Sequence, residues 1–328
     1  MKRFKNILYV NETGVNQMSA LARAVSLAKS NQADLTVIDV VPDQVIAAAV
    51  GLPPEGLSAE ELKAEVTTDR RRAIAALIAP FTQDLDIQIQ VVTGKRFLAV
   101  IRMVLSRSFD LVVKPAEDPD WMDRLFGSDD MHLLRKCPCP VWLIKPSQKT
   151  RFNTVLAAVD IDPVNPLPAN QDLNRTILEL AGSIALADNS SLHLAHAWDA
   201  SAEQTFLSQK GISSKSIDAY VEKKQAIHKN GLSTLGADLE KWVNANAQNP
   251  IDPRLHLIQG PAEKMIPHLA KDLSADLVVM GTIARTGISG LIIGNTAEAV
   301  FHQLMCSILA VKPPGFKTPV KLPVHSEQ

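Results

Sequence analysis

Long apolar runs are scarce in this chain of 328 residues. The longest lies around residues 45–52, well short of the roughly 18 residues that a membrane-spanning helix needs. The apolar run at residues 7–10 is too short for the core of a secretion signal, so we expect no leader peptide. The sequence therefore predicts no membrane span.

Cysteine is scarce as well, and neither sign of charge is in clear excess. Cys137, Cys139 and Cys306 are too few for a disulfide framework and fit a reducing compartment. The spacing of Cys137 and Cys139 matches neither a CxxC redox pair nor a zinc site, which favours buried structural roles. Lys plus Arg number 34 and Asp plus Glu 35, so no basic surface for nucleic acid is predicted. We expect a cytoplasmic protein.

What the chain does contain is one pattern written twice. FKNILYVNE from Phe4 matches FNTVLAAVD from Phe152, SLAKSNQADL matches SIALADNSSL, FDLVVKPA matches ADLVVMGT, and CPVWLIKP from Cys139 matches CSILAVKP from Cys306. Because the matches occur in the same order, they indicate a duplicated domain. We predict domains at residues 1–147 and 151–314, followed by an extended arm at 315–328.

Each half alternates short apolar runs with longer segments of helical spacing. The expected strands are residues 7–10, 35–41, 87–92, 111–113 and 141–144, and in the second half 154–159, 192–197, 255–258, 277–280 and 307–311. This alternation is typical of parallel strands joined by crossover helices. The predicted fold class is α/β, with two tandem doubly wound domains.

Residues 280–298, MGTIARTGISGLIIGNTAE, are the segment with the strongest signal for ligand binding. They follow a predicted strand at the sheet edge where parallel α/β sheets bind ligands. Glycines allow the backbone to approach a ligand closely. Those of this segment are Gly281, Gly287, Gly290 and Gly294. Gly294, Asn295 and Thr296 are expected to open a helix whose N–H groups favour phosphate; alternatively, Asn295 is an N-cap paired with Glu298.

The same segment resembles the nucleotide-binding motif of the universal stress protein family. That motif has glycine, two residues, glycine, nine residues, then glycine with serine or threonine. The spacing is kept here from Gly281 to Gly294, with Ala284 at the second glycine and Asn295 at the hydroxyl residue. The segments HLLRKCPCPVW, RTGIS, GNTAE and TPV extend the resemblance to the tandem, E-type members over nearly the whole chain.

The resemblance implies a stress-response protein, with a five-stranded parallel sheet and helices on both faces in each domain. It implies one adenine-nucleotide site (ATP or AMP, with Mg²⁺) in the second domain, acting as a sensor or conformational switch. The residues expected to form this site are Asp160, Gly281, Thr282, Arg285, Gly287, Gly294, Asn295 and Thr296. Asp160 would accept from the ribose hydroxyls, or alternatively form an Asx turn ahead of Pro163. Family members pair into dimers, so the two domains of one chain are expected to pair, and a homodimer is a further option.

The matching loop of the first domain, KPAEDPDWMDRLFGSDD from Lys114, lacks these features. Pro115 stands at the position of Gly281. Asp129 and Asp130, in the first turn of the following helix, would satisfy the helix dipole and repel a triphosphate. We therefore expect no nucleotide binding by the first domain, and structural capping roles for these two aspartates.

Two other functions compete with nucleotide sensing. Because Ala284 and Asn295 depart from the motif, a rival hypothesis is a module that binds a hydrophobic or lipid-like ligand in a cavity beneath residues 45–52, or a protein partner. His193 and His196 superficially resemble the HxGH motif of nucleotidylyl transferases, but they fall on a predicted strand, which disfavours that role. No P-loop, GxGxxG, GxSxG or HExxH motif occurs. We expect no catalytic activity beyond weak, incidental hydrolysis of ATP.

Overall fold

The computed structural model describes residues 4–45, 58–117, 129–146, 150–163, 167–244, 250–282 and 293–322. They fall into two compact units, the first comprising residues up to Thr150 together with 317–322, and the second comprising the rest. In the first unit, Arg102 Nε donates to the Lys321 carbonyl at 3.4 Å. Across these ranges no helix has the length and apolar content to cross a membrane.

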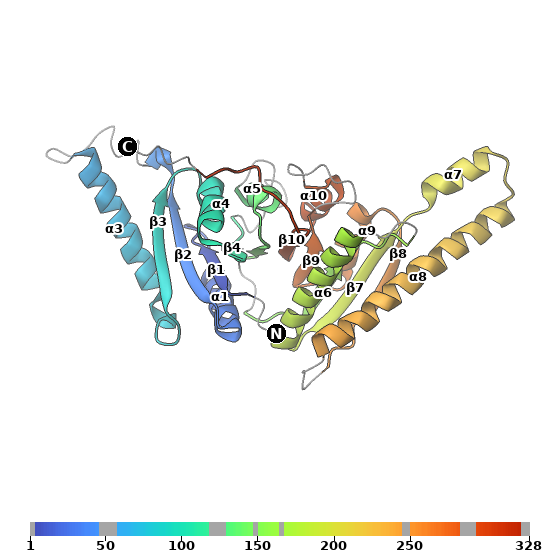
Figure 1. Ribbon diagram of the computed structural model, residues 1–328, viewed down its shortest axis with the longest axis horizontal. Coiled ribbons are helices and arrows are strands. Elements are labelled where there is room, and N and C mark those ends of the chain that lie inside the picture. The colour runs from blue at the N-terminus through green and yellow to red at the C-terminus, as the bar shows by residue number, and fades with distance from the viewer. Residues whose placement is uncertain are drawn as a thin grey trace. The chain divides into compact units, whose positions relative to one another are not determined.

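The first unit is built on a parallel sheet whose described strands follow the order β3-β2-β1-β4-β5 (Figure 1). The strands are β1 (Asn6–Val10), β2 (Asp34–Val41), β3 (Ile87–Thr93), β4 (Leu111–Pro115) and β5 (Val141–Ile144). The helices are α1 (Met18–Asn31), α3 (Ala59–Ile78), α4 (Arg96–Arg107) and α5 (Asp129–Lys136), with a 3₁₀ turn η1 (Ala79–Phe81). The central strands are buried on both faces, which explains their nearly continuous apolar runs.

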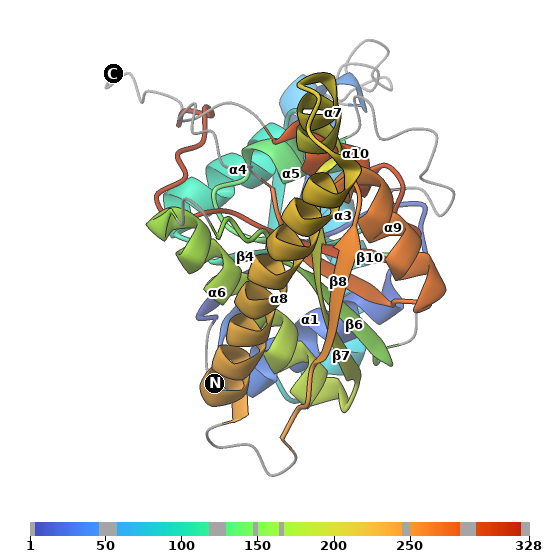
Figure 2. The same cartoon turned by 90° about the vertical axis from the view of Figure 1, so that its right-hand side faces the viewer.

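The second unit repeats this plan with the order β10-β9-β6-β7-β8. Its strands are β6 (Thr154–Ala158), β7 (Ser191–Trp198), β8 (Arg254–Gln259), β9 (Leu277–Gly281) and β10 (Ser307–Val311). Its helices are α6 (Pro168–Asp188), α7 (Ser201–Gln209), α8 (Ser214–Asn244), α9 (Ala262–Asp272) and α10 (Asn295–Phe301). Figure 2 shows the long helix α8 running across β7 and β8, with which it is in contact.

The duplication extends to strand register. Ile7 of β1 pairs with Leu35 and Leu111, and Val155 of β6 pairs with Leu192 and Leu277, which are the matching positions of the repeat. All the predicted strands are present, so the predicted α/β fold with two tandem doubly wound domains is confirmed.

Right-handed crossovers place helices on both faces of each sheet. In the second unit, α6 and α8 connect strands in one direction along the sheet and pack on each other. Helices α9 and α10 connect strands in the opposite direction and also pack on each other. The strand order therefore reverses beside β6 and β9, and this switch point opens a crevice at their carboxyl ends. The equivalent point of the first unit lies between β1 and β4.

Candidate functional site

A cavity of about 360 Å³ occupies the switch point of the second unit. Its walls are mostly apolar and include Ile177, Ile266, Met280 and Val300. Side chains with polar groups come from Asp160, Asn174 and Thr296. A cavity of this volume and lining fits one flat, mostly apolar group with a few directed hydrogen bonds at its edge.

Asp160 is held at this cavity through its backbone. It lies two residues after the end of β6, and its N–H donates to Asn174 Oδ1 at 3.2 Å while its carbonyl accepts from Asn174 Nδ2 at 2.7 Å. Asn174 is buried on α6, so packing of α6 sets the position of Asp160. The first unit uses the same device, since Glu12 N–H donates to Gln17 Oε1 at 3.2 Å. The side chain of Asp160 is exposed and lines the cavity.

Gly281, the last residue of β9, also lines the cavity. A Cβ at this position would lie 2.8 Å from Leu173 Cδ2, which is closer than side-chain carbons approach. Because the backbone of Gly281 is ordinary strand backbone, the constraint at this position is space, and a larger residue would displace the Leu173 side chain. Gly281 therefore lets Leu173 of α6 form the wall of the cavity.

Thr282 lies behind this wall and outside the lining. It is fully buried, and both its N–H and its hydroxyl donate to the Val311 carbonyl, at 3.0 and 3.4 Å. Its carbonyl accepts from Gly294 N–H at 2.8 Å, which places Gly294 as the N-cap of α10. The alternative prediction that Asn295 is the N-cap is therefore wrong. Asn295 is the first helical residue, and the carbonyl of Gly294 accepts the first helical hydrogen bond, from Glu298 N–H at 3.0 Å.

Of the predicted site residues, the structure thus brings Asp160, Gly281 and Thr296 together around one cavity. Arg285 and Gly287 lie outside the described residues. So does most of the segment 45–52, beneath which a hydrophobic ligand was predicted to bind. Within the described ranges, no group of three or more His, Cys, Asp or Glu side chains could hold a metal ion.

A second cavity of about 490 Å³ adjoins the first and shares Asp160 and Asn174 with it. It lies between the N-terminal part of α6 and α8, and the guanidinium of Arg175 lies over the ring of Trp242 at 5.1 Å. Its acidic lining residues are Asp160, Asp162, Asp172 and Asp238. This cavity was not predicted from the sequence, because α8 lies in a segment where the two halves of the chain do not match and the repeat gives no guide to its position.

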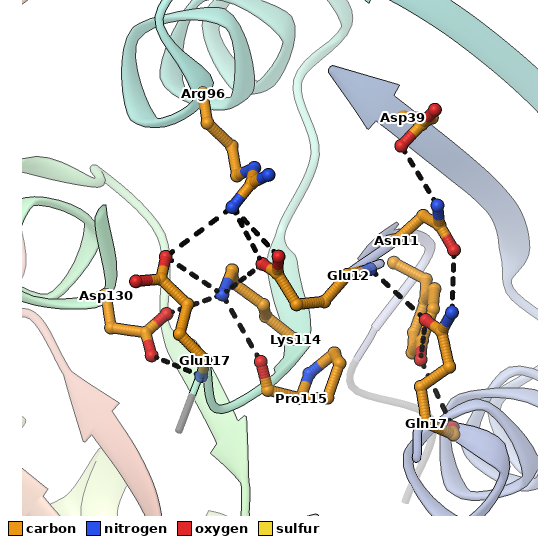
Figure 3. A network of polar contacts seen from close by, with 10 residues as sticks. Asn11, Glu12, Gln17, Asp39, Arg96, Lys114, Pro115, Glu117 and Asp130 are labelled. Carbon is orange, nitrogen blue, oxygen red and sulfur yellow. Dashed lines mark hydrogen bonds and ion pairs between the residues drawn. The ribbon is translucent and has the colours of Figure 1, made fainter. Parts of the chain in front are cut away.

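The switch point of the first unit holds charged side chains (Figure 3). Lys114 Nζ lies 2.7 Å from Asp130 Oδ1, 2.8 Å from Glu12 Oε2 and 3.4 Å from Glu117 Oε1. Arg96 Nη1 lies 2.9 Å from the other oxygen of Glu12. Burial by itself lowers the pKa of Lys114, but the carboxylates, Asp130 foremost, raise that pKa above its usual value. We call these five residues the charge cluster.

Four of the five residues of the charge cluster occupy positions that line the cavity of the second unit. The repeat and the first turns of matching helices pair Glu12 with Asp160, Arg96 with Ala262, Lys114 with Met280, and Asp130 with Ala297. Ala262 and Ala297 leave space that the longer side chains of Arg96 and Asp130 fill in the first unit, and apolar Met280 stands where Lys114 does. Asp129 and Asp130 do lie in the first turn of α5, as predicted. The prediction of a capping role did not include the ion pair that the Asp130 carboxylate forms with buried Lys114.

The charge cluster was not predicted, although one residue of the sequence indicates it. Lys114 interrupts the apolar run of β4 at a central strand position, where a lysine is buried only with carboxylate partners. The three cysteines are all buried, which confirms their predicted structural roles.

Histidine pairs were missed too. His193 and His196 lie on β7, as predicted, with His193 Nδ1 2.9 Å from His256 Nε2 and His196 Nε2 2.9 Å from His228 Nδ1. Burial, followed by repulsion from the neighbouring His256 and Arg254, lowers the pKa of His193. One pair joins the neighbouring strands β7 and β8, and the other joins β7 to α8. None of these four histidines lines the first cavity.

Comparison with known proteins agrees with the repeat. The model of the universal stress protein family matches residues 3–145 and again 152–312. The chain is 31% identical over 328 residues to universal stress protein E of Escherichia coli strain K12, covering 98% of each chain. The structure resembles a universal stress protein from Pseudomonas aeruginosa, described as putative, with a TM-score of 0.65, 24% identity and coverage of 95% of this chain and 94% of that one. A universal stress protein from Archaeoglobus fulgidus has a TM-score of 0.58, 15% identity and coverage of 94% and 96%. At these identities the two structures support the fold alone.

Proposed function

Because the chain belongs to the universal stress protein family, we propose that it is a stress-response protein whose second unit binds one adenine nucleotide as a sensor or conformational switch. The observation that supports this proposal is the apolar cavity at the switch point, with Asp160 on its wall. In the first unit the corresponding space contains the charge cluster, so a single site per chain is proposed.

The base, the ribose and the phosphates of a nucleotide would each meet a different part of the cavity. A purine ring suits the apolar walls, and Asp160 would accept hydrogen bonds from the ribose hydroxyls. Gly281 and Thr296 would lie toward the phosphates, with Gly287, Gly294 and Asn295 around them and Arg285 as counter-ion. The described residues offer no group of metal ligands, so Mg²⁺ would be held chiefly by the phosphates. Thr282 would support this arrangement from behind through its bonds to Val311 and Gly294.

Calorimetric titration with ATP and Mg²⁺ tests the proposal. We expect saturable heat from the wild type at one site per chain and a rise in melting temperature, since a ligand that binds only the folded state stabilises it. Asp160→Ala should weaken binding at least about tenfold, because a charged hydrogen-bond partner contributes about 1.5–3 kcal/mol. Asp218→Ala, at an exposed position of α8, is the matched control and should bind as the wild type does. Absence of heat at millimolar ATP would overturn the proposal.

A hydrophobic ligand is the second candidate for the same cavity. Among its described lining residues there is no lysine, arginine or histidine, while aliphatic side chains predominate. Native mass spectrometry of the freshly purified protein separates the two candidates. A retained mass of an adenine nucleotide supports the first, and a retained lipid-like mass that Ile266→Asp removes supports the second.

We propose binding rather than catalysis as the role of the site. Any ATP hydrolysis would be slow, and a phosphate-release assay in which Asp160→Ala abolishes rapid turnover would contradict this expectation. A cytoplasmic location, pairing of the two domains within one chain and a homodimer are further expectations. Cell fractionation tests the location, and sedimentation of the purified protein tests the homodimer.

A further inference from the structure

The charge cluster of the first unit contains more negative than positive groups. Its carboxylates are Glu12, Glu117 and Asp130, and its cations are Arg96 and Lys114. Lys114 is fully buried, and the side chains of Glu12 and Asp130 are only 6% and 3% exposed. With all five groups ionised, the charges of these described residues sum to one net negative charge in a poorly hydrated place, which is energetically costly.

Distances identify the carboxylate that is held most weakly. Glu12 and Asp130 each approach a cation within 2.9 Å. Among the described cations, Glu117 makes longer contacts, 3.4 Å to Lys114 Nζ and 3.8 Å to Arg96 Nη1. Its side chain is 27% exposed, so water reaches it while it also adjoins the buried groups (Figure 3).

We propose that the charge cluster is a proton-binding site, in which the Glu117 carboxylate takes a proton from solvent. Uptake converts Glu117 to the neutral acid and leaves two carboxylates opposite two cations. The first unit would thus bind a proton beside the four charged residues that match the cavity lining of the second unit. This role is independent of the proposed nucleotide site.

The surroundings of Glu117 agree with this assignment. Burial, followed by repulsion from Asp130, raises the pKa of Glu117 to about 7, against an opposing effect of Lys114. The charged groups that face it are Glu12 from the end of β1, Arg96 from α4, Lys114 from β4, and Asp129 and Asp130 from α5. Each of these elements borders the switch point, so the protonation state of Glu117 affects the attraction that holds them together.

Carboxyl ¹³C resonances of glutamate-labelled full-length protein test the proposal directly. We expect one resonance with a midpoint near pH 7, absent from Glu117→Gln and present in Glu65→Gln, an exposed control on α3. Asp129→Asn should move this midpoint to lower pH, because it removes a negative charge that raises the pKa of Glu117.

Unfolding by urea at several pH values gives an independent measure. Stability of the wild type should fall as the pH rises from the ordinary glutamate pKa of 4.5 to about 7, where the folded state binds one more proton than the unfolded state, and Glu117→Gln should remove that component. A Glu117 resonance that titrates below about pH 5.5, near the usual range of a carboxyl group, would overturn the proposal. So would a pH profile of stability that Glu117→Gln leaves unchanged.

Discussion

Lys114 of the first unit and Met280 of the second unit occupy equivalent positions, but their surroundings differ. Met280 borders a cavity, whereas Lys114 is enclosed by carboxylates. Side chains of similar length therefore produce either an apolar wall or a buried cation. A buried charge is stable only while all of its partners remain, so the cluster is sensitive to single substitutions.

Lys114→Met, which places the second unit's residue in the first, should lower the free energy of unfolding by about 3–5 kcal/mol, because it leaves Glu12 and Asp130 buried without their closest cation. Urea unfolding followed by circular dichroism measures the change. The control is Lys29→Met, which breaks an exposed pair with Asp84 and should cost about 1 kcal/mol or less. Equal losses from both variants would contradict the structural role given to Lys114.

Helices α6 and α8 approach each other closely at Gly182. A Cβ there would lie 2.8 Å from Val243 Cγ2 and 3.2 Å from Leu239 Cδ1. Alanine favours a helix over glycine by about 1 kcal/mol, whereas overpacking costs about 1–3 kcal/mol. We expect Gly182→Ala to destabilise the protein by about 1 kcal/mol net.

The double variant Gly182→Ala with Val243→Ala distinguishes packing from propensity. If crowding of Val243 causes the loss, the double variant should be more stable than the sum of the two single changes indicates, as a double-mutant cycle measures. Strict additivity of the two changes would contradict the close contact. This prediction concerns a segment of α8 in which the two halves of the chain do not match.

At the level of elements, the strands were predictable and the contacts between helices were not. The apolar runs of β1, β4, β6 and β9 identify buried strands, because parallel strands are covered on both faces. The switch point follows from strand order, so the neighbourhood of Asp160 and Gly281 was predictable too. The charge cluster joins side chains from four elements far apart in the sequence, and only the packing of α4 and α5 on the sheet brings Arg96 to Glu12 and Asp130 to Lys114. The length and position of α8, which shape the second cavity, have no counterpart in the repeat.

Over the whole molecule, Glu117 of the first unit and a histidine pair of the second unit have opposite effects on stability as the pH changes. His132 of α5, whose pKa is lowered by burial and by Lys136, partly opposes Glu117 within the first unit. The pKa of Glu117 in the first unit is raised to about 7, whereas the pKa values of His193 and His256 in the second are lowered, mainly by burial. A carboxyl group with a raised pKa contributes stability that is fully present below its unfolded pKa and is lost as the pH rises through about 7. A histidine with a lowered pKa contributes stability that is present above its unfolded pKa and is lost as the pH falls through its folded value.

We therefore expect the relative stability of the two units to change with pH in opposite directions. Between about pH 5.5 and about pH 8, amide protection of β1 and β4 should decrease, and that of β7 and β8 should increase, once exchange rates are corrected for intrinsic pH dependence. Hydrogen exchange resolved by peptide measures both units in one sample. Glu117→Gln should remove the trend in the first unit only, and His256→Gln should reduce it in the second unit only, because it removes the partner of His193. A common trend in both units, unaffected by either variant, would mean that groups elsewhere in the chain determine its response to pH.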